Sequence, residues 1–243
     1  WNAARFALYY ECVYDPDFDP VCLTSTLNRW IVMELGACSE ALEKALKDYR
    51  FDEATRIVDQ FTRGIFCDWY LELAKSFLIN HDKEETQKTV AYVLVQLCHI
   101  LNPFIPFVTE EIWCHFRPHS CLLMGQKWPV MTFSDFKAKD ELTWVMDVIE
   151  KVRALRVIFN IPPKEPLHMA IEEGDDLAHK AFNAYQEVIK RLLNLETLTW
   201  GVPNTALFQK MCVKEMTPNA VLRIPLSHFL KGDEEIKRLN SLK

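Results

Sequence analysis

Glycine is scarce in this chain, at only six of 243 residues. No glycine-rich phosphate loop occurs, and neither a G-x-S-x-G nor an H-E-x-x-H motif is present. No run of about 18 apolar residues occurs either, so the sequence predicts neither a membrane span nor a membrane partner. Without a recognisable catalytic constellation, the chain is predicted to have no catalytic residues and to bind a partner instead.

The eight cysteines are dispersed, and none forms a C-x-x-C pair. This pattern suits a reducing compartment better than a disulfide framework, so we expect a cytoplasmic protein. Residues 114–121 (CHFRPHSC) hold four potential metal ligands, which leaves a metal site as the lesser alternative. Their spacing fits no common zinc motif, and we expect a Cys/His-rich loop with no metal and no cofactor in this chain.

The charge is unevenly distributed along the chain. The net charge is −6; residues 1–136 carry 12 Lys/Arg against 19 Asp/Glu (−7), and residues 137–243 carry 16 against 15 (+1). Because phosphate contacts usually need a basic surface, any nucleic-acid site must be a local basic patch.

The first half has the periodicity of long amphipathic helices. Proline-rich breaks separate the periodic stretches at 15–20 and 102–106. Helices joined by short links predict an antiparallel bundle, which we assign to residues 1–136. The expected helices cover 1–13, 24–48, 51–78, 84–101 and 105–116.

The second half changes its period. A helix over 138–160 ends at Pro162-Pro163, and we assign residues 137–166 to a linker helix. Residues 167–230 are predicted to form a small α+β subdomain, and 231–243 the truncated start of a C-terminal helix or coiled coil. Within the subdomain we expect strands at 167–172, 195–200, 207–213 and 220–225, and a helix at 175–193 with Asp175 as its N-cap. The predicted fold is therefore mainly α, a helix bundle followed by a small α+β subdomain.

Two sets of carboxylates invite a catalytic interpretation, which we consider the weaker one. Glu110 and Glu111 are expected in the first turn of a helix, where negative charge offsets the helix dipole. Asp68 stands in an aromatic stretch, and we expect a structural ion pair with an arginine such as Arg5 or Arg29.

Several strings resemble, in order, the anticodon-binding region of valyl-tRNA synthetases, which are class I aminoacyl-tRNA synthetases. They are WNAARF at 1–6, NRWI at 28–31, YRFDEA at 49–54, FCDWYLELAK at 66–75, NPFIPFVTEEIW at 102–113, RALR at 153–156 and NIPPK at 160–164. The string at 66–75 is typical of the valine enzymes, whereas the one at 102–113 is shared with isoleucine and leucine enzymes. Asn28 replaces the family's Asp, and Asn102 replaces its His. The resemblance is strong over 1–166 and weak over 167–230.

The resemblance implies a valine–tRNA ligase, an enzyme that joins valine to tRNA(Val) using ATP and Mg. The nucleotide-binding and editing regions of the family precede the resembling part, and this chain begins without Met. We therefore expect a fragment that works with a missing catalytic domain of the same protein and grips the anticodon arm of tRNA(Val), as a monomer. The alternatives are the same region of an isoleucyl- or leucyl-tRNA synthetase, or a helical scaffold that binds proteins.

The resemblance also suggests where the tRNA binds, because the first helix and the end of the fifth frame the anticodon in related class I enzymes. The expected contacts on these helices are Asn2, Arg5, Tyr9, Trp113, Phe116 and Arg117. Core packing is the alternative for Trp1, Phe6 and Trp113. Lys151, Arg153 and Arg156 are expected to form a basic stripe on the linker helix that meets phosphates, with a solvated face as the alternative.

Overall fold

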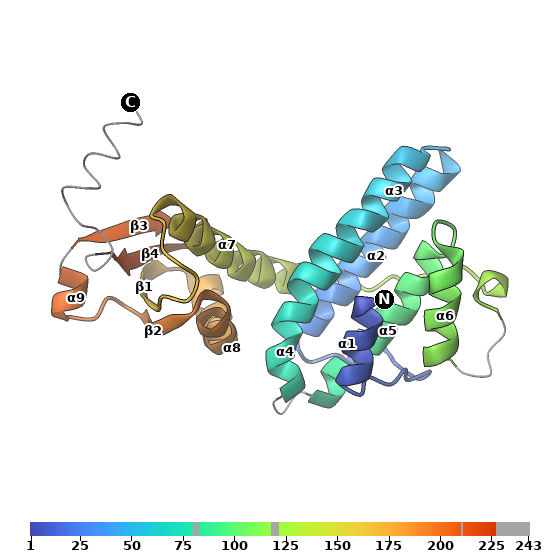
Figure 1. The fold of residues 1–243 in the computed structure, drawn as a ribbon, viewed down its shortest axis with the longest axis horizontal. Helices are drawn as coiled ribbons and strands as arrows, with labels where there is room; N and C mark the ends of the chain where they lie inside the picture. Colours follow the sequence, from blue (N-terminus) through green and yellow to red (C-terminus); the bar gives the residue numbers. More distant parts are fainter. Residues whose placement is uncertain (80–82, 118–121, 210, 227–243) are drawn as a thin grey trace. The chain divides into compact units, whose positions relative to one another are not determined.

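The structure, a computed structural model, describes residues 1–79, 83–117, 122–209 and 211–226 (Figure 1). The chain forms two compact units, Trp1–Lys139 and Asp140–Lys243, called here the helical unit and the α+β unit. Long helices make up the first, and the second contains a small mixed sheet, which confirms the predicted fold class. In the part of the chain that is described, no helix is both long enough and apolar enough to cross a bilayer.

The helical unit is a bundle of helices with short connections. α2 packs against α3 and α5, and α5 also contacts α1, α4 and α6. Helix α7 begins in this unit and continues into the α+β unit. The elements are α1 (Asn2–Tyr9), η1 (Pro20–Cys22), α2 (Thr26–Lys47), α3 (Phe51–Asp59), η2 (Gln60–Tyr70), α4 (Leu71–Ile79), α5 (Lys83–Leu101), α6 (Pro106–Phe116), η3 (Leu123–Gly125) and α7 (Phe136–Ile158).

Helix α2 shows why the bundle forms. Leu27, Ile31, Leu35 and Leu42 recur on one face of the helix, and all four are fully buried. Burial of each such side chain contributes roughly 1.5–3 kcal/mol, which outweighs the small differences in helix propensity along the surface. The predicted apolar stripe of this helix is therefore confirmed.

The stretch predicted as one helix over 51–78 is continuous but not uniform. It runs as α3, a π-helical segment η2 and α4. A π-helix takes more residues per turn than an α-helix, so side chains after Gln60 are rotated relative to an α-helical count. Asp68 is exposed as a result, and Arg29 pairs with Asp135 at 2.6 Å instead. The predicted ion pair of Asp68 with Arg5 or Arg29 is wrong, since neither pair forms among the described residues.

Asn28, which stands where the family has Asp, is fully buried at the centre of a polar network. Its amide nitrogen donates to Glu85 Oε1 (2.9 Å) and Thr86 Oγ1 (3.2 Å), and its oxygen accepts from the Tyr70 hydroxyl (2.9 Å). Glu85 also accepts from Thr24 and Ser25 ahead of α2. An amide suits this position because it offers both a donor and an acceptor, whereas a carboxylate would face Glu85.

The paired carboxylates of α6 lie later in the helix than predicted. The helix begins at Pro106, so Glu110 and Glu111 follow the first turn, and its start carries no acidic residue. Glu110 has a structural role, because both its oxygens accept the backbone N–H of Leu123, at 3.0 and 3.1 Å. The Thr109 hydroxyl likewise accepts from the Asn102 amide, at 3.0 Å.

The α+β unit contains a four-stranded sheet in the order β2-β1-β4-β3. β1 and β2 are parallel and joined through α8, while β4 is antiparallel to both β1 and β3. Asp175 caps α8 as predicted, accepting from Ala178 N at 2.9 Å. The elements are β1 (Leu167–Gly174), α8 (Asp176–Leu193), β2 (Leu195–Trp200), α9 (Ala206–Gln209), β3 (Cys212–Met216) and β4 (Ala220–Pro225).

The predicted strand over 207–213 is wrong in its first half. Residues 206–209 form the short helix α9, and β3 begins only at Cys212. A short apolar run cannot be told from a buried helical turn by its pattern alone. Phe208 is buried, and its carbonyl accepts from Arg223 Nη2 at 3.2 Å, which holds the turn against β4. The predicted C-terminal helix at 231–243 lies outside the described residues.

Candidate nucleic-acid interface

Helix α1 has an exposed side formed by Asn2, Arg5 and Tyr9, called here the outer stripe. Ala4 and Ala7 are buried on its inner side, where small side chains let the helix approach the bundle. Asn2, Arg5 and Tyr9 are exposed and recur at helical spacing, so they share the outer side. Tyr9 is 80% exposed. The stripe offers an amide, a guanidinium and an uncovered aromatic ring.

Arg5 differs from most cations of the helical unit because it has no carboxylate partner. Lys47, Arg63 and Lys88, for example, form ion pairs with acids within 3.2 Å. Among the described residues, Arg5 has neither an ion pair nor a hydrogen bond from its side chain. Its charge is therefore not offset by a neighbouring carboxylate, and the five donors of its planar guanidinium remain available to a ligand.

The end of α6 provides an aromatic cluster, but most of it is covered. Trp113 is only 2% exposed and Phe116 is also buried, so both contribute mainly to the core. The His99 ring meets Trp113 edge-on, with centroids 4.9 Å apart. Burial, and secondarily the charge of Arg117, lowers the pKa of His99, so this imidazole is neutral at pH 7 and adds no charge to the surface.

Arg117 connects the two predicted halves of the site. Its Cζ lies 4.6 Å from the centroid of the Tyr14 ring and 5.3 Å from that of Trp113. Tyr14 follows α1 closely, so this double cation–π contact fixes the segment after α1 to the end of α6. The sequence did not point to Tyr14, because it lies in the break where the helical period stops.

The predicted basic stripe on α7 is only partly a surface. Arg153 is exposed, and Lys151 is half-buried with Asp147 at 3.8 Å. Arg156 is buried, and its guanidinium donates to the carbonyls of Pro162 (3.0 Å), Glu165 (2.9 Å) and Leu193 (2.6 Å). Arg156 is therefore a structural residue, and its predicted contact with phosphates is wrong because its guanidinium is occupied by these carbonyls.

The structure thus gathers Asn2, Arg5 and Tyr9 on α1, and links α1 to α6 through Tyr14 and Arg117. Lys151 and Arg153 belong to the α+β unit. Cys114 and His115 of the possible metal cluster are exposed, while His119 and Cys121 lie outside the described residues. Within the described residues, no group of three or more His, Cys, Asp or Glu is arranged to hold a metal ion.

Comparison with known proteins gives a consistent result. Residues 28–171 match the family model described as the anticodon-binding domain of tRNA ligase. Curated relatives include valine–tRNA ligases of three bacteria. That of Bartonella henselae is 33% identical over 98% of this chain and 27% of its own length. That of Rhizobium meliloti is 35% identical over 82% of this chain and 22% of its own length. That of Ruegeria pomeroyi is 32% identical over 100% of this chain and 24% of its own length. The chain spans about a quarter of the length of these relatives.

Proposed function

This chain belongs to the family of tRNA-ligase anticodon-binding domains, and from that premise we propose that its helical unit binds the anticodon loop of the valine tRNA. The observation that supports the proposal most directly is the outer stripe of α1. There, an uncovered tyrosine stands beside an arginine without a carboxylate partner and an exposed amide.

These three groups suit the unpaired bases of an anticodon. Single-stranded bases can stack on aromatic rings and be read on their exposed edges. The valine anticodon ends in A and C. We propose that Tyr9 stacks on one of these bases, that the Asn2 amide pairs with the adenine edge, and that Arg5 meets a phosphate or a base plane. Arg117 positions the segment after α1, with Trp113 and Phe116 supporting it, and Lys151 and Arg153 remain candidates for phosphate contacts.

We also propose that the longer protein is a cytoplasmic, monomeric valine–tRNA ligase, in which other regions use ATP and Mg to join valine to its tRNA. The relatives bear that name and are about four times as long as this chain. No glycine-rich phosphate loop occurs among the residues of this chain, and we derive no catalytic step from them.

Binding of the chain to an anticodon stem-loop tests the proposal. The RNA would be a 17-nucleotide hairpin with the valine anticodon, compared with one whose middle anticodon base is changed, over a salt series. Tyr9→Ala is matched by Tyr49→Ala, because both tyrosines are 80% exposed and only Tyr9 lies on α1. Arg5→Met is matched by Lys44→Met, which removes another exposed cation without an ion pair among the described residues.

We expect Tyr9→Ala to weaken binding about fivefold to 150-fold, which corresponds to the roughly 1–3 kcal/mol of one base stacked on an aromatic ring. Arg5→Met should reduce the slope of log K against log salt by about 0.7, the value for one phosphate contact to a single strand. The two control variants should change neither quantity. Equal effects of the α1 variants and their controls, or no preference for the valine anticodon, would contradict a readout by α1.

A further inference from the structure

One segment of the helical unit has the pattern of a β-strand without a strand partner. Between η3 and α7, burial alternates residue by residue: Pro129, Met131 and Phe133 are half-buried, whereas Val130 and Thr132 are exposed. A two-residue period is the signature of extended strand conformation. No backbone group of residues 127–134 forms a hydrogen bond with any described residue. The segment therefore has the burial pattern of an extended strand and no hydrogen-bonded partner strand among the described residues.

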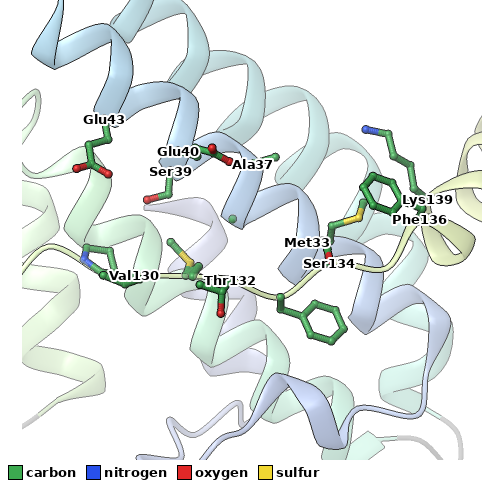
Figure 2. A pocket seen from close by; sticks show the side chains of 14 residues that line it. Met33, Ala37, Ser39, Glu40, Glu43, Val130, Thr132, Ser134, Phe136 and Lys139 are labelled. Carbon is green, nitrogen blue, oxygen red and sulfur yellow. The ribbon is translucent and has the colours of Figure 1, made fainter.

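This strand lies alongside α2 and borders a groove. Figure 2 shows Val130 near Glu43 and Ser134 near Met33, so the segment and the helix run in opposite directions. The groove has a volume of about 560 Å³ and is lined on the helix side by the exposed Ala37 and Glu40, whereas at the buried Gly36 the segment lies directly against the helix. A Cβ built on Gly36 would lie 3.5 Å from the Met131 carbonyl oxygen, at ordinary contact distance.

Carboxylates dominate the charge of this groove. Glu40 is exposed and has no ion pair among the described residues, and Glu43 is half exposed beside Lys47 at 2.7 Å. Lys139 stands at the far end but is bound by Glu34 at 3.2 Å. A second hollow of about 470 Å³ on the same segment contains Asp19. Phosphate groups would be repelled here, whereas lysine and arginine side chains would be attracted.

We propose that residues 129–134 and the adjacent side of α2 form a docking site for an extended, basic segment of a polypeptide. The segment would add as a second strand beside 129–134, because an unpaired row of N–H and C=O groups is a template for strand addition. Its basic side chains would face Glu40 and Glu43, and alternate apolar side chains would meet Val130, which is 87% exposed, and Phe136. This proposal does not depend on the RNA function of α1.

A synthetic probe tests the docking site directly. It is an acetylated, amidated octapeptide of alternating Lys and Val, labelled with fluorescein and titrated with the 243-residue chain by anisotropy. Three peptides serve for comparison: one with Glu in place of every Lys, and two with N-methyl groups on the Lys or the Val amides. Each methylated peptide keeps the charge but loses the donors of one strand edge. Hydrogen exchange of the chain reports on the amides of residues 130–134.

We expect the Lys/Val peptide to bind, the Glu/Val peptide not to bind, and one methylated peptide to bind at least about tenfold more weakly, the effect of losing two hydrogen bonds. Bound peptide should slow exchange at 130–134. Equal binding of all peptides, or unchanged exchange there, would overturn the proposal.

Protein variants then locate the groove. Glu40→Lys should weaken peptide binding about threefold to tenfold. This corresponds to about twice the free energy of one exposed charge contact, because the variant replaces an attraction with a repulsion. Glu111→Lys is its control, since Glu111 is another exposed helical glutamate without an ion pair among the described residues. Ala37→Trp should block the groove while an unchanged melting temperature shows that the chain still folds. Displacement of the peptide by an oligouridylate with the same Glu40 dependence would mean an RNA site, and the proposal would be wrong.

Discussion

Arg156 offers the sharpest test of how a structural arginine differs from one that meets a ligand. It is 7% exposed, and burial lowers the pKa of its guanidinium, yet the group stays charged because a guanidinium is too strong a base to lose its proton in a protein. It donates to carbonyls of Pro162 and Glu165 after α7, and to Leu193 at the end of α8. These bonds join the connection before β1 to the C-terminal end of α8, where the helix dipole favours positive charge.

Arg156→Met should destabilise the α+β unit by about 3–5 kcal/mol. A hydrogen bond to a charged group contributes roughly 1.5–3 kcal/mol, and the three bonds are not additive because water can reach part of the exposed connection at 163–165. Arg156→Lys should retain only a fraction of the stability that Arg156→Met loses, since a single ammonium cannot match the planar fork of guanidinium donors. Arg153→Met is the control, as an exposed residue three positions earlier, and should change stability by less than about 0.5 kcal/mol.

Native-state hydrogen exchange is the appropriate assay, because two compact units need not unfold in one transition. The slowest amides of β1 and α8 report the free energy of opening of the α+β unit. Less than about 1 kcal/mol lost in Arg156→Met, together with a shallower salt dependence of RNA binding, would refute the structural assignment.

Two further predictions concern the network around Asn28. Burial opposes ionisation of Glu85, but hydrogen bonds from Thr24, Asn28 and Ser25 outweigh it and lower its pKa below the usual 4.5. Ionised Glu85 therefore stabilises the fold above pH 4.5, and this stabilisation is lost as the pH falls through the folded-state pKa of Glu85. The urea midpoint should decrease between pH 7 and pH 3, and Glu85→Gln should make the midpoint less dependent on pH. Asn28→Asp should cost about 1–3 kcal/mol at pH 7 by urea unfolding, because it replaces the donor to Glu85 with a second carboxylate. Adding Glu85→Gln should restore most of that loss; no loss in the single variant would mean that the network rearranges.

The helices of the bundle could be predicted because local periodicity determines which side is buried. The same periodicity, applied to α7, predicts that Arg156 is buried. It follows Ile149 and Val152 by seven and four residues, and both of these are fully buried, so Arg156 falls on the apolar side of the helix. Arg153 follows Ile149 by four residues but is only one position from Val152, so it lies at the edge of the apolar side, and it is exposed. The predicted surface stripe of Lys151, Arg153 and Arg156 ignored the burial of Arg156.

What could not be predicted depends on contacts between distant parts of the chain. The π-helical segment leaves Asp68 in solvent, and no residue pattern in the stretch signals the added turn width. The contact of Arg117 with Tyr14 joins residues about a hundred positions apart, one of them in a non-periodic loop. The exposed stripe of α1 was accessible to sequence reasoning because it needs only one helix and two buried alanines, Ala4 and Ala7.

The acidity of the helical unit is compatible with RNA binding once its charges are followed individually. Most lysines and arginines there are neutralised by nearby acids, so the surface has no broad positive field and RNA affinity must come mainly from stacking and base edges. Arg5 on α1 is an exception, and it lies next to the exposed ring of Tyr9 one turn away. Two of the unit's carboxylates, Glu40 and Glu43, line the groove beside α2. Glu40 and Glu43 therefore disfavour phosphate at the groove of α2, which agrees with our proposal that the anticodon approaches α1.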